Sequence, residues 1–250
     1  MCAAIARYDS VAVAFSGGVD STFLLHTAKT VLGDRVVAFH AVTPLQTSEE
    51  QNRAVRFAGQ IGCRLVRFPF DPFSWPEFVA NPPDRCYLCK KKIYSLFQGA
   101  LAAHGCNALL DGTNLDDLDD YRPGLKAVRE LGCLTPLAEC GFTKAEVRAC
   151  SREAGLVSWE QPSSSCLATR IRSGVAITPD NIDFVARCEN YLMSQGVSGS
   201  RVRWGAEELV VEVCEQDISL VDYLSKGPLL SQMACEAGFA GVAVAIRQCR

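Results

Sequence analysis

Residues 15–22 of the chain, Phe-Ser-Gly-Gly-Val-Asp-Ser-Thr, combine two glycines with three hydroxyl side chains in a short segment. The segment follows an apolar run, residues 11–15, and leads into a helix-like run, residues 22–32. Glycines let the backbone approach a ligand closely, and the first turn of a helix offers unpaired N–H groups at the positive end of its dipole. The pattern therefore predicts a phosphate-binding loop with the contacts Ser16, Gly17, Gly18, Ser21 and Thr22.

The same segment carries Asp20 but lacks the lysine of a Walker A loop. Ser-Gly-Gly-x-Asp-Ser instead resembles the PP-loop of ATP pyrophosphatases, which cleave ATP to AMP and pyrophosphate and so activate a substrate by adenylation. The resemblance implies an ATP-dependent enzyme. An acid beside bound phosphates needs a cation between them, so we assign Asp20 to magnesium or to holding the loop.

Composition limits the remaining function classes. The chain has 250 residues, 48% of them hydrophobic, which suffices for one large domain or two modest ones. A net charge of −3 gives no general basic surface, so we expect no nucleic-acid partner. No apolar run reaches the ~18 residues of a membrane span, and the first residues do not resemble a signal peptide. Thirteen cysteines without such a signal predict a reducing, cytoplasmic location.

Apolar runs alternate with amphipathic stretches over the first part of the chain. Buried strands are predicted at residues 11–15, 36–42, 64–68 and 108–111, with helices at 22–32, 49–61 and 91–104 between them. A proline-rich connection, residues 69–83, leads to the segment 84–90. This alternation predicts an α/β fold with a doubly wound, mostly parallel sheet, whose ligands bind at the carboxyl ends of its strands.

A second, smaller unit is predicted after the Ser-rich segment 159–170, which is too polar for a core element. A helix at 143–154, with Thr143 as its N-cap, precedes that segment. The elements predicted beyond it are a helix at 178–195, strands at 201–204 and 209–213, a helix at 229–236 and a strand at 242–246. We therefore predict a PP-loop domain of residues 1–172 and a small α+β domain of residues 173–250 for substrate binding and oligomerisation.

Several motifs resemble, in their order along the chain, those of the LarE-type sulfur transferases. They are the PP-loop, Arg85–Lys90, Asp111–Asp117, Arg122–Gly124, Thr143–Lys144, Ser165–Ile171 and Arg201–Arg203. Members of that family use ATP to place sulfur into the nickel-pincer nucleotide cofactor. The resemblance implies that ATP adenylates a carboxylate of pyridinium-3,5-biscarboxylic acid mononucleotide and that a sulfur nucleophile then displaces AMP. Magnesium would neutralise charge on the departing pyrophosphate.

By the same resemblance, the loop that follows the fourth predicted strand contacts adenosine or a metal. Its residues are Asp111, Gly112, Thr113 and Asn114. From the residues alone, an Asx-type turn that caps a helix is the alternative explanation.

Sulfur delivery would depend on cysteines. Cys166 falls where some family members sacrifice a cysteine sulfur and keep dehydroalanine. With Cys86 and Cys89 it supplies three thiolates, which suit a 4Fe-4S cluster with one open iron, whereas structural zinc needs a fourth protein ligand. A subgroup of the family resembles this three-cysteine pattern and is thought to transfer a sulfide held on the open iron, so we favour cluster-bound sulfide over self-sacrifice. A redox dithiol, a zinc site and inert buried thiols are the alternatives.

The implied substrate carries a phosphate and carboxylates, so cationic side chains must meet it. Arg201 and Arg203 lie two apart on a predicted strand, share a face and can grip one phosphate, unless that face is merely exposed. The resemblance adds four further candidates: Arg122, Arg170, Glu189 and Glu212. Trp75, in the proline-rich connection, could stack on the substrate or anchor a core.

Other proteins with this kind of loop are the alternatives to a LarE-type enzyme. They are a PP-loop tRNA thiolase with a 4Fe-4S cluster, an ammonia-using ATP-dependent amidotransferase or synthetase, and a non-enzymatic iron–sulfur carrier or nucleotide-binding regulator. Two departures limit the family resemblance: Thr169 stands where a serine is common, and residues 172–175 differ from the usual turn. The family further implies a homo-oligomer, a hexamer, while the sulfur donor stays unassigned.

Overall fold

The computed structural model describes residues 1–120, 122–162, 165–197 and 199–247. The chain forms two compact units, Met1–Pro72 with Asp84–Gln161, and Phe73–Pro83 with Pro162–Arg250. The sequence predicted a boundary after residue 172, whereas residues 162–172 and most of the proline-rich connection here belong to the second unit. Asn81 accounts for this difference, because its side-chain amide donates to the carbonyls of Arg172 and Val175 at 2.8 Å each.

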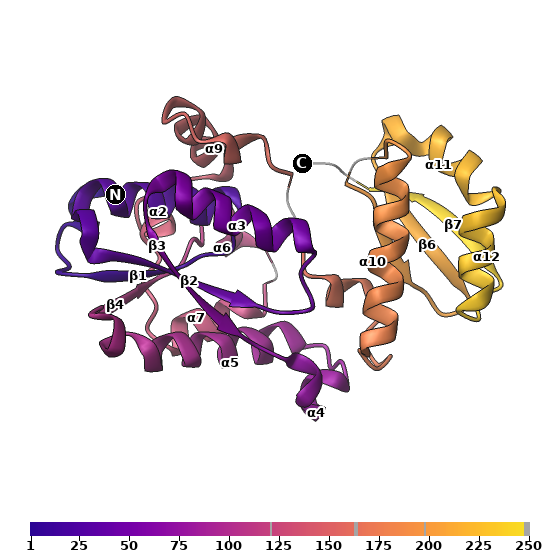
Figure 1. Ribbon diagram of the computed structural model, residues 1–250, viewed down its shortest axis with the longest axis horizontal. Coiled ribbons are helices and arrows are strands. Elements are labelled where there is room, and N and C mark those ends of the chain that lie inside the picture. The colour runs from indigo at the N-terminus through magenta and orange to yellow at the C-terminus, as the bar shows by residue number, and fades with distance from the viewer. Residues whose placement is uncertain (121, 163–164, 198, 248–250) are drawn as a thin grey trace. The chain divides into compact units, whose positions relative to one another are not determined.

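The first unit is built on a parallel sheet with the strand order β3-β2-β1-β4 (Figure 1). The strands are β1 (Val11–Ala14), β2 (Val36–Val42), β3 (Arg64–Pro69) and β4 (Ala108–Leu110). The helices are α1 (Cys2–Ile5), α2 (Val19–Leu32), α3 (Ser48–Ile61), α5 (Arg85–Ala100), α6 (Asp116–Asp119), α7 (Gly124–Glu130), α8 (Pro136–Glu139) and α9 (Lys144–Glu153). The predicted α/β class with a doubly wound parallel sheet is confirmed.

Helices cover both faces of this sheet, as Figure 1 shows for α2 and α3 on one side and α5 and α7 on the other. Val11 and Val13 of β1 pack with residues of α2, α3 and α9. Ala12 and Ala14 face the opposite side and pack with residues of α5 and α7. All four are buried, as expected for a central parallel strand. The burial fixes the strand register and brings the loops after β1 and β4 to one edge of the sheet.

The second unit contains a mixed sheet with the order β5-β6-β7, in which β5 is antiparallel to β6 and β7 is parallel to it. The strands are β5 (Arg201–Trp204), β6 (Glu208–Val213) and β7 (Gly241–Ile246), and the helices are α4 (Pro76–Val79), α10 (Pro179–Ser194), α11 (Ile218–Ser225) and α12 (Pro228–Glu236). Phe184 of α10 meets the ring of Trp204 edge-on at 5.5 Å, and Trp204 meets Phe239 at 4.8 Å. This aromatic cluster joins α10 to the sheet, and the unit is the small α+β unit that the sequence predicted.

Several helices begin at threonines whose side chains cap them. Thr143 caps α9 through a reciprocal pair of hydrogen bonds with Glu146, as predicted, and Thr47 caps α3 in the same way. The predicted start of α5 at residue 91 is wrong: α5 begins at Arg85, because no proline follows Pro83 to stop it and Asp84 takes the N-cap position. None of the helices in the described parts of the chain has both the length and the apolar character needed to cross a membrane.

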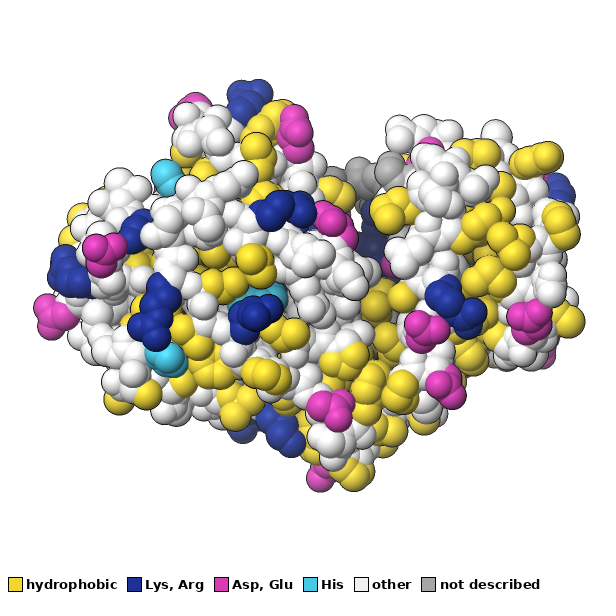
Figure 2. All heavy atoms as spheres, in the orientation of Figure 1, with side chains coloured by type: hydrophobic (Ala, Val, Ile, Leu, Met, Phe, Trp, Pro, Cys, Tyr) yellow, Lys and Arg dark blue, Asp and Glu magenta, His cyan; other side chains and the backbone are white. Residues whose placement is uncertain are grey.

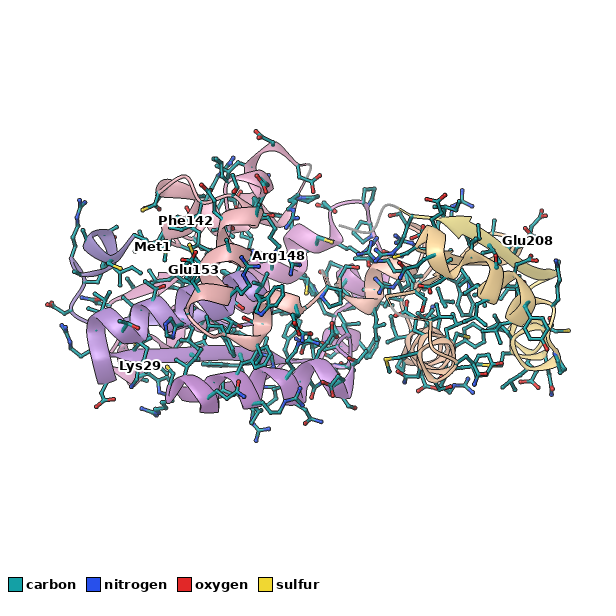
Figure 3. The ribbon with its side chains drawn as sticks, turned by 90° about the horizontal axis from the view of Figure 1, so that it is seen from above. Met1, Lys29, Phe142, Arg148, Glu153 and Glu208 are labelled. Carbon is teal, nitrogen blue, oxygen red and sulfur yellow. The ribbon has the colours of Figure 1, made fainter. Side chains whose placement is uncertain are left out.

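The contacts of α9 fasten it to the neighbouring segments of the first unit. Phe142, just before α9, packs against Phe23 of α2 with ring centroids 5.9 Å apart. Arg148 reaches back to the chain that follows α9 and donates to the carbonyls of Trp159 and Gln161, the latter at 2.8 Å. Figure 3 labels Phe142 and Arg148 on this part of the chain. The packing holds Lys144, the first residue of α9, at a fixed place beside α2.

Candidate functional site

The loop between β1 and α2 is held in shape by its own hydroxyl groups. The Oγ atoms of Ser16 and Ser21 lie 3.1 Å apart, and the Ser21 hydroxyl donates to the Gly18 carbonyl at 3.1 Å. The backbone N–H of Ser16 donates to Ser21 Oγ at 3.3 Å, and that of Gly18 donates to Ser16 Oγ at 3.3 Å. The serines therefore shape the loop, while the first turn of α2 leaves N–H groups without an intrahelical acceptor.

Two glycines of the site stand where the backbone of another segment comes close. Gly17 has a φ of +76°, and a Cβ added there would lie 2.9 Å from the Cα of Ala54 in α3. A Cβ on Gly112 would lie 3.1 Å from the backbone N of Ser21. The loop after β4 thus packs directly against the start of α2, and the structure brings together the two segments that were predicted to share a ligand.

The carboxylate of Asp20 joins three segments. Asn114 Nδ2 donates to Asp20 Oδ1 at 3.1 Å, and Lys144 Nζ forms an ion pair with Asp20 Oδ2 at 2.5 Å. Both carboxylate oxygens therefore have partners from the β4 loop and from α9. Of the two roles assigned to Asp20, this geometry supports holding the loop, and the role in binding magnesium stays a prediction.

Asp111 is buried, with 4% of its surface exposed, and anchors the loop after β4. The backbone N–H and the hydroxyl of Thr113 both donate to Asp111 Oδ1, the former at 2.8 Å. The hydroxyl of Tyr94 donates to Oδ2, and Lys90 Nζ lies 3.1 Å from the same atom. Burial raises the pKa of Asp111, but the Lys90 charge and these hydrogen bonds outweigh it, so the pKa lies below its ordinary value.

Asn114 and Asp117 close the turn that follows. The Asp117 N–H donates to Asn114 Oδ1 at 3.1 Å, and the Asn114 N–H donates to Asp117 Oδ2 at 3.1 Å. Arg122 Nη1 pairs with Asp117 Oδ1 at 2.7 Å. The capping turn that the residues alone suggested is therefore present, and Arg122 belongs to it in the first unit rather than to the cluster of arginines in the second. A direct contact of this loop with adenosine or metal stays a prediction.

A histidine supports the loop from the sheet side. His40 of β2 is 1% exposed, and its Nδ1 lies 2.7 Å from the carbonyl oxygen of Phe15, the residue before the loop. Nδ1 is the donor, because a carbonyl oxygen can only accept, and burial lowers the pKa of His40, which favours the neutral ring. The ring therefore fixes the end of β1 without adding charge beneath the loop.

The candidate sulfur-handling cysteines are divided between the two units. Cys86 and Cys89 lie in the first turns of α5 at a spacing that puts both on one helix face, and Cys166 lies in the second unit. Cys86 and Cys166 are exposed and Cys89 is half-buried. Within the described ranges, no group of three or more His, Cys, Asp or Glu side chains is close enough to hold a metal. The three-cysteine site therefore stays a prediction.

Two other cysteines, the half-buried Cys133 and the buried Cys188, have raised pKa values. Burial raises the pKa of Cys133 to about 11 and that of Cys188 to about 12. A thiol with so high a pKa is protonated at neutral pH and packs as a small hydrophobic group. Both cysteines are therefore suited to a structural role rather than to sulfur chemistry.

In the second unit, a buried ion pair connects the Ser-rich segment to α10. Arg170 is 5% exposed, its Nε donates to Glu189 Oε1 at 2.7 Å, and its Nη2 lies 3.3 Å from Glu189 Oε2. The Nη1 of Arg170 donates to the hydroxyl of Ser165. Glu189 also accepts the backbone N–H of Val202 in β5 at 2.9 Å. The pair therefore fixes the segment after Cys166 on β5.

Arg203, which lies on β5 itself, is held by similar contacts. Its Nη2 lies 2.9 Å from Glu212 Oε2, and its Nη1 donates to the carbonyl of Thr169 at 2.7 Å. Arg201 shares the face of Arg203, is half-buried and pairs in register with Glu212 across the strands. The structure thus brings together the predicted residues Arg170, Glu189, Arg201, Arg203 and Glu212.

Trp75 lies elsewhere in the second unit, just before α4. Its ring stacks on Phe78, with centroids 6.2 Å apart and planes inclined by 20°. Phe78 is buried, so Trp75 covers a hydrophobic anchor on one face. Stacking of Trp75 on a substrate stays a prediction.

Sequence reasoning missed several contributors because their partners lie far away in the chain. Lys144 meets Asp20 across 124 residues, and nothing in the local pattern of either segment pairs them. Tyr94 was assigned to a helix without a role, although it donates to Asp111. The one available signal was the motif around Thr143 and Lys144, which resembled the family without indicating a contact.

No family model matches the chain, but similar proteins are known. The chain is 40% identical over 195 residues to an uncharacterized protein of Synechocystis, a span that covers 78% of this chain and 73% of that protein. It is 37% identical over 240 residues to the pyridinium-3,5-bisthiocarboxylic acid mononucleotide synthase of Lactiplantibacillus plantarum, covering 96% of this chain and 86% of that enzyme. The chain belongs to the LarE family.

This LarE-family chain is also similar to one of the subunits of glutamine-hydrolyzing GMP synthases. For the subunit from Archaeoglobus fulgidus the identity is 26% over 189 residues, covering 70% of this chain and 61% of that protein. Both kinds of relative fit the PP-loop superfamily that the loop at residues 15–22 predicted. The LarE-family chain is thus an ATP-using enzyme with a PP-loop fold.

The distribution of lysine and arginine side chains on the surface is relevant to the alternative function of a tRNA thiolase. On the face of the LarE-family chain drawn in Figure 2, lysine and arginine side chains lie singly, with acidic and apolar groups between them. A protein that tracks a nucleic-acid backbone gathers such side chains into a patch or stripe. Figure 2 draws one face of the molecule, so the choice between the two classes of enzyme rests on the turnover experiment.

Proposed function

We propose that the chain is an ATP-dependent sulfur transferase that converts a carboxylate of pyridinium-3,5-biscarboxylic acid mononucleotide to a thiocarboxylate, for nickel-pincer nucleotide synthesis. The product class is the one in the name of the Lactiplantibacillus plantarum relative. The observation that carries the proposal is the hydroxyl-bonded loop at the start of α2, packed against the β4 loop. We place the activity in the cytoplasm and in a homo-oligomer, as the family resemblance implies.

The first half-reaction uses the loop of the first unit. A substrate carboxylate oxygen attacks the α-phosphorus of ATP, the bond to the β-phosphate oxygen breaks, and pyrophosphate leaves with the electron pair. The first-turn N–H groups of α2 would meet the phosphates, because they lack acceptors of their own. Asp20, neutralised by Lys144, would hold these groups in place without repelling the nucleotide. The product is an acyl-adenylate, which has a good leaving group where the carboxylate had none.

The second half-reaction replaces AMP by sulfur. A sulfur nucleophile attacks the acyl carbon, the bond from that carbon to the AMP oxygen breaks, and AMP leaves. Cys86, Cys89 and Cys166 fit the task by chemistry and exposure, since none is a deeply buried thiol. A 4Fe-4S cluster held by these three would supply sulfide on its open iron. Without a cluster, Cys166 Sγ would attack the acyl carbon, and loss of the Cα proton with cleavage of the Cβ–Sγ bond would release the thiocarboxylate and leave dehydroalanine.

Turnover with defined substrates tests the activation step. The protein is incubated with ATP, magnesium and the biscarboxylate mononucleotide, and pyrophosphate and thiocarboxylate are measured together. We expect pyrophosphate only when the mononucleotide is present. Ammonia-dependent formation of an amide instead of a thiocarboxylate would contradict the proposal and point to the synthetase alternative, while copurifying RNA that is thiolated would point to the tRNA alternative.

The sulfur source needs a separate experiment. Protein purified without oxygen is assayed for iron and sulfide, and the mass of the chain is measured before and after turnover. We expect bound iron and an unchanged mass, and Cys166→Ala to abolish thiocarboxylate formation but not pyrophosphate release. Cys235→Ala is the matched control, since Cys235 is another exposed thiol of the second unit. A loss of one sulfur from Cys166 during turnover would exclude the cluster mechanism.

A further inference from the structure

An asparagine of the second unit has a backbone conformation that is rare outside glycine. Asn81, two residues after α4, has a φ of +54°, and it is the one non-glycine residue with a positive φ in the described ranges. Asparagine tolerates the left-handed region better than most residues, yet glycine adopts it without steric cost. Backbone conformation alone would therefore favour glycine, so the side chain is what makes asparagine suitable here.

The side-chain amide of Asn81 is buried and bonded to a single short turn. Its residue is 0% exposed, and its Nδ2 donates to the carbonyls of Arg172 and Val175 at 2.8 Å each. The carbonyl of Ile171 lies 3.4 Å from the same nitrogen. A buried amide is costly unless its N–H groups find acceptors, and both N–H groups find them here. The asparagine thus holds this turn from the inside.

The segment that carries this asparagine is itself fixed in the second unit. The segment Phe73–Pro83 belongs to that unit, and the ring of Phe78, 1% exposed, anchors it there. Two backbone bonds add to the amide: the Ile177 N–H donates to the carbonyl of Val79 at 2.9 Å, and the Gly174 N–H donates to the asparagine carbonyl at 3.1 Å. The amide is therefore held on a firm support.

The turn that Asn81 holds continues the segment that carries Cys166. Ile171 follows Cys166 by five residues, and the intervening Leu167–Arg170 form a short 3-10 helix. The Thr169 hydroxyl donates to the Cys166 carbonyl at 2.7 Å and closes this helix onto the cysteine. Because one tight turn joins them, a movement of the held residues is passed on to the thiol.

We propose that Asn81 is a positioning residue for sulfur transfer. By holding the turn after Cys166, it fixes the place of that thiol relative to the acyl carbon, whichever of the two sulfur sources the enzyme uses. A displacement of about 1 Å between reacting groups can cost about a hundredfold in rate. The importance of Cys166 rests on the proposed function, whereas the grip on its segment rests on the contacts of this chain.

Two substitutions at residue 81 separate the backbone from the side chain. Asn81→Gly keeps the left-handed backbone and removes the amide, whereas Asn81→Asp puts a carboxylate against carbonyl oxygens. Pyrophosphate and thiocarboxylate are measured in the same reaction. We expect both variants to release pyrophosphate at close to the wild-type rate and to form roughly tenfold less thiocarboxylate per pyrophosphate. The loss should be larger for Asn81→Asp, because two acceptors face each other there.

Asn181→Ala is the matched control. Asn181 is also buried, at 6% exposed, and its Nδ2 donates to the carbonyl of Ala176 at 2.7 Å, but its role is to cap α10. The substitution should lower the midpoint of urea unfolding and leave thiocarboxylate per pyrophosphate unchanged. A wild-type ratio in Asn81→Gly would overturn the inference. An equal fall of the ratio in Asn181→Ala would also overturn it, since general loosening of the second unit would then explain both.

Alkylation of Cys166 distinguishes failure of the inference from failure of the proposed function. The tryptic peptide of residues 153–170 contains one cysteine, so its mass gives the rate at which iodoacetamide modifies Cys166. If wild type forms no thiocarboxylate, the proposed function fails and this rate decides. A several-fold change in Asn81→Gly but not in Asn181→Ala supports the inference, and any other pattern rejects it.

Hydrogen exchange on wild type decides if the variants at residue 81 do not fold. The N–H groups of Gly174 and Ile177 donate to the segment that carries Asn81, so they should exchange as slowly as those of β6 in the same unit. Fast exchange at both would show that the turn is not held, and the inference would be wrong.

Discussion

The two units of the chain manage charge in opposite ways. Around the loop of the first unit, three buried or half-buried acids each pair with a cation: Asp20 with Lys144, Asp111 with Lys90, and Asp117 with Arg122. In the second unit, Arg170 pairs with Glu189 and Arg203 pairs with Glu212, and burial together with the charges of neighbouring arginines lowers the pKa of the half-buried Arg201 beside them. A helix N-terminus attracts phosphate through its backbone N–H groups. The charged side chains around the loop of the first unit can therefore pair with one another without removing the attraction for phosphate. A sheet edge has no such dipole and must attract an anion through side-chain charge.

Substitution of Gly17 is the strongest test of the role of the backbone in the loop of the first unit. Replacing Gly17 by alanine places a Cβ 2.9 Å from the Cα of Ala54 at a φ of +76°. Because the backbone of α3 cannot move aside as a side chain can, we expect the free energy of unfolding to fall by at least about 2 kcal/mol. We also expect the variant to lose pyrophosphate release. Urea unfolding and a pyrophosphate assay measure the two effects.

Gly62→Ala is the matched control, because Gly62 has a φ of +68° but no atom within 4 Å of the added Cβ. It should destabilise the fold by about 1 kcal/mol, the cost of left-handed backbone alone, with pyrophosphate release retained. Equal effects of the two substitutions would mean that the close approach of α3 to the loop is unimportant.

The side-chain half of the comparison is tested at the buried pair in the second unit. Arg170→Met leaves the Glu189 carboxylate without its partner in a place where the two side chains are 6% and 15% exposed. We expect a loss of about 3–5 kcal/mol in the free energy of unfolding, since the cost of an uncompensated buried charge exceeds the gain of forming a pair. Chemical denaturation of the second unit, followed by the fluorescence of Trp204, reports it.

The double variant Arg170→Met with Glu189→Gln separates charge from packing. Removing the orphaned charge should restore part of the lost stability, because a neutral amide is cheaper to bury. If the double variant is no more stable than Arg170→Met alone, the loss comes from packing, and the contrast in charge between the units weakens.

Neutralisation within the first unit is tested by a smaller effect at Lys144. Lys144→Met leaves Asp20 with Asn114 as its remaining partner beside the expected phosphates, so we predict roughly a tenfold rise in KM for ATP. Adding Asp20→Asn to Lys144→Met should lower the KM for ATP part of the way back, because the charge that repels the phosphates is gone. If the effects of Lys144→Met and Asp20→Asn on the KM for ATP are independent and add up in the double variant, Lys144 acts on the nucleotide directly rather than through Asp20.

The two regions also differ in how much of them the sequence predicted. The loop of the first unit is local: its strand, its serines and glycines and its helix follow one another within residues 11–32. Hydrophobic periodicity and residue type therefore predicted the strand, the loop and the helix together, while the ligand contacts of the loop stay predictions. The hydrogen bond between the hydroxyls of Ser16 and Ser21 is one that no pattern shows, and their contacts with phosphate stay predictions. The early start of α5 was missed because its first turn carries the cysteine motif, whose spacing is typical of a metal-binding loop as well as of a helix.

The arginine cluster is assembled from distant segments. Arg201 and Arg203 were identified because alternate residues of a strand share a face. Glu212, which pairs with Arg203 from the neighbouring strand, was named only by family resemblance. Contacts between elements far apart in the chain depend on sheet order, and periodicity within an element carries no information about that order.

The smallest effect we predict is a dependence of stability on pH at Asp111. Its pKa in the folded chain lies below the ordinary 3.8, since Lys90 and its hydrogen bonds outweigh burial. The carboxylate therefore stabilises the fold above pH 3.8, and this contribution is lost as the pH falls through the folded pKa. The stability difference between wild type and Asp111→Asn, from urea unfolding at pH 7 to 3, should shrink in acid. Tyr94→Phe should flatten that dependence by removing one hydrogen bond, and a difference that grows in acid would mean that Asp111 is held neutral, against the pairing of acids and bases seen throughout the first unit.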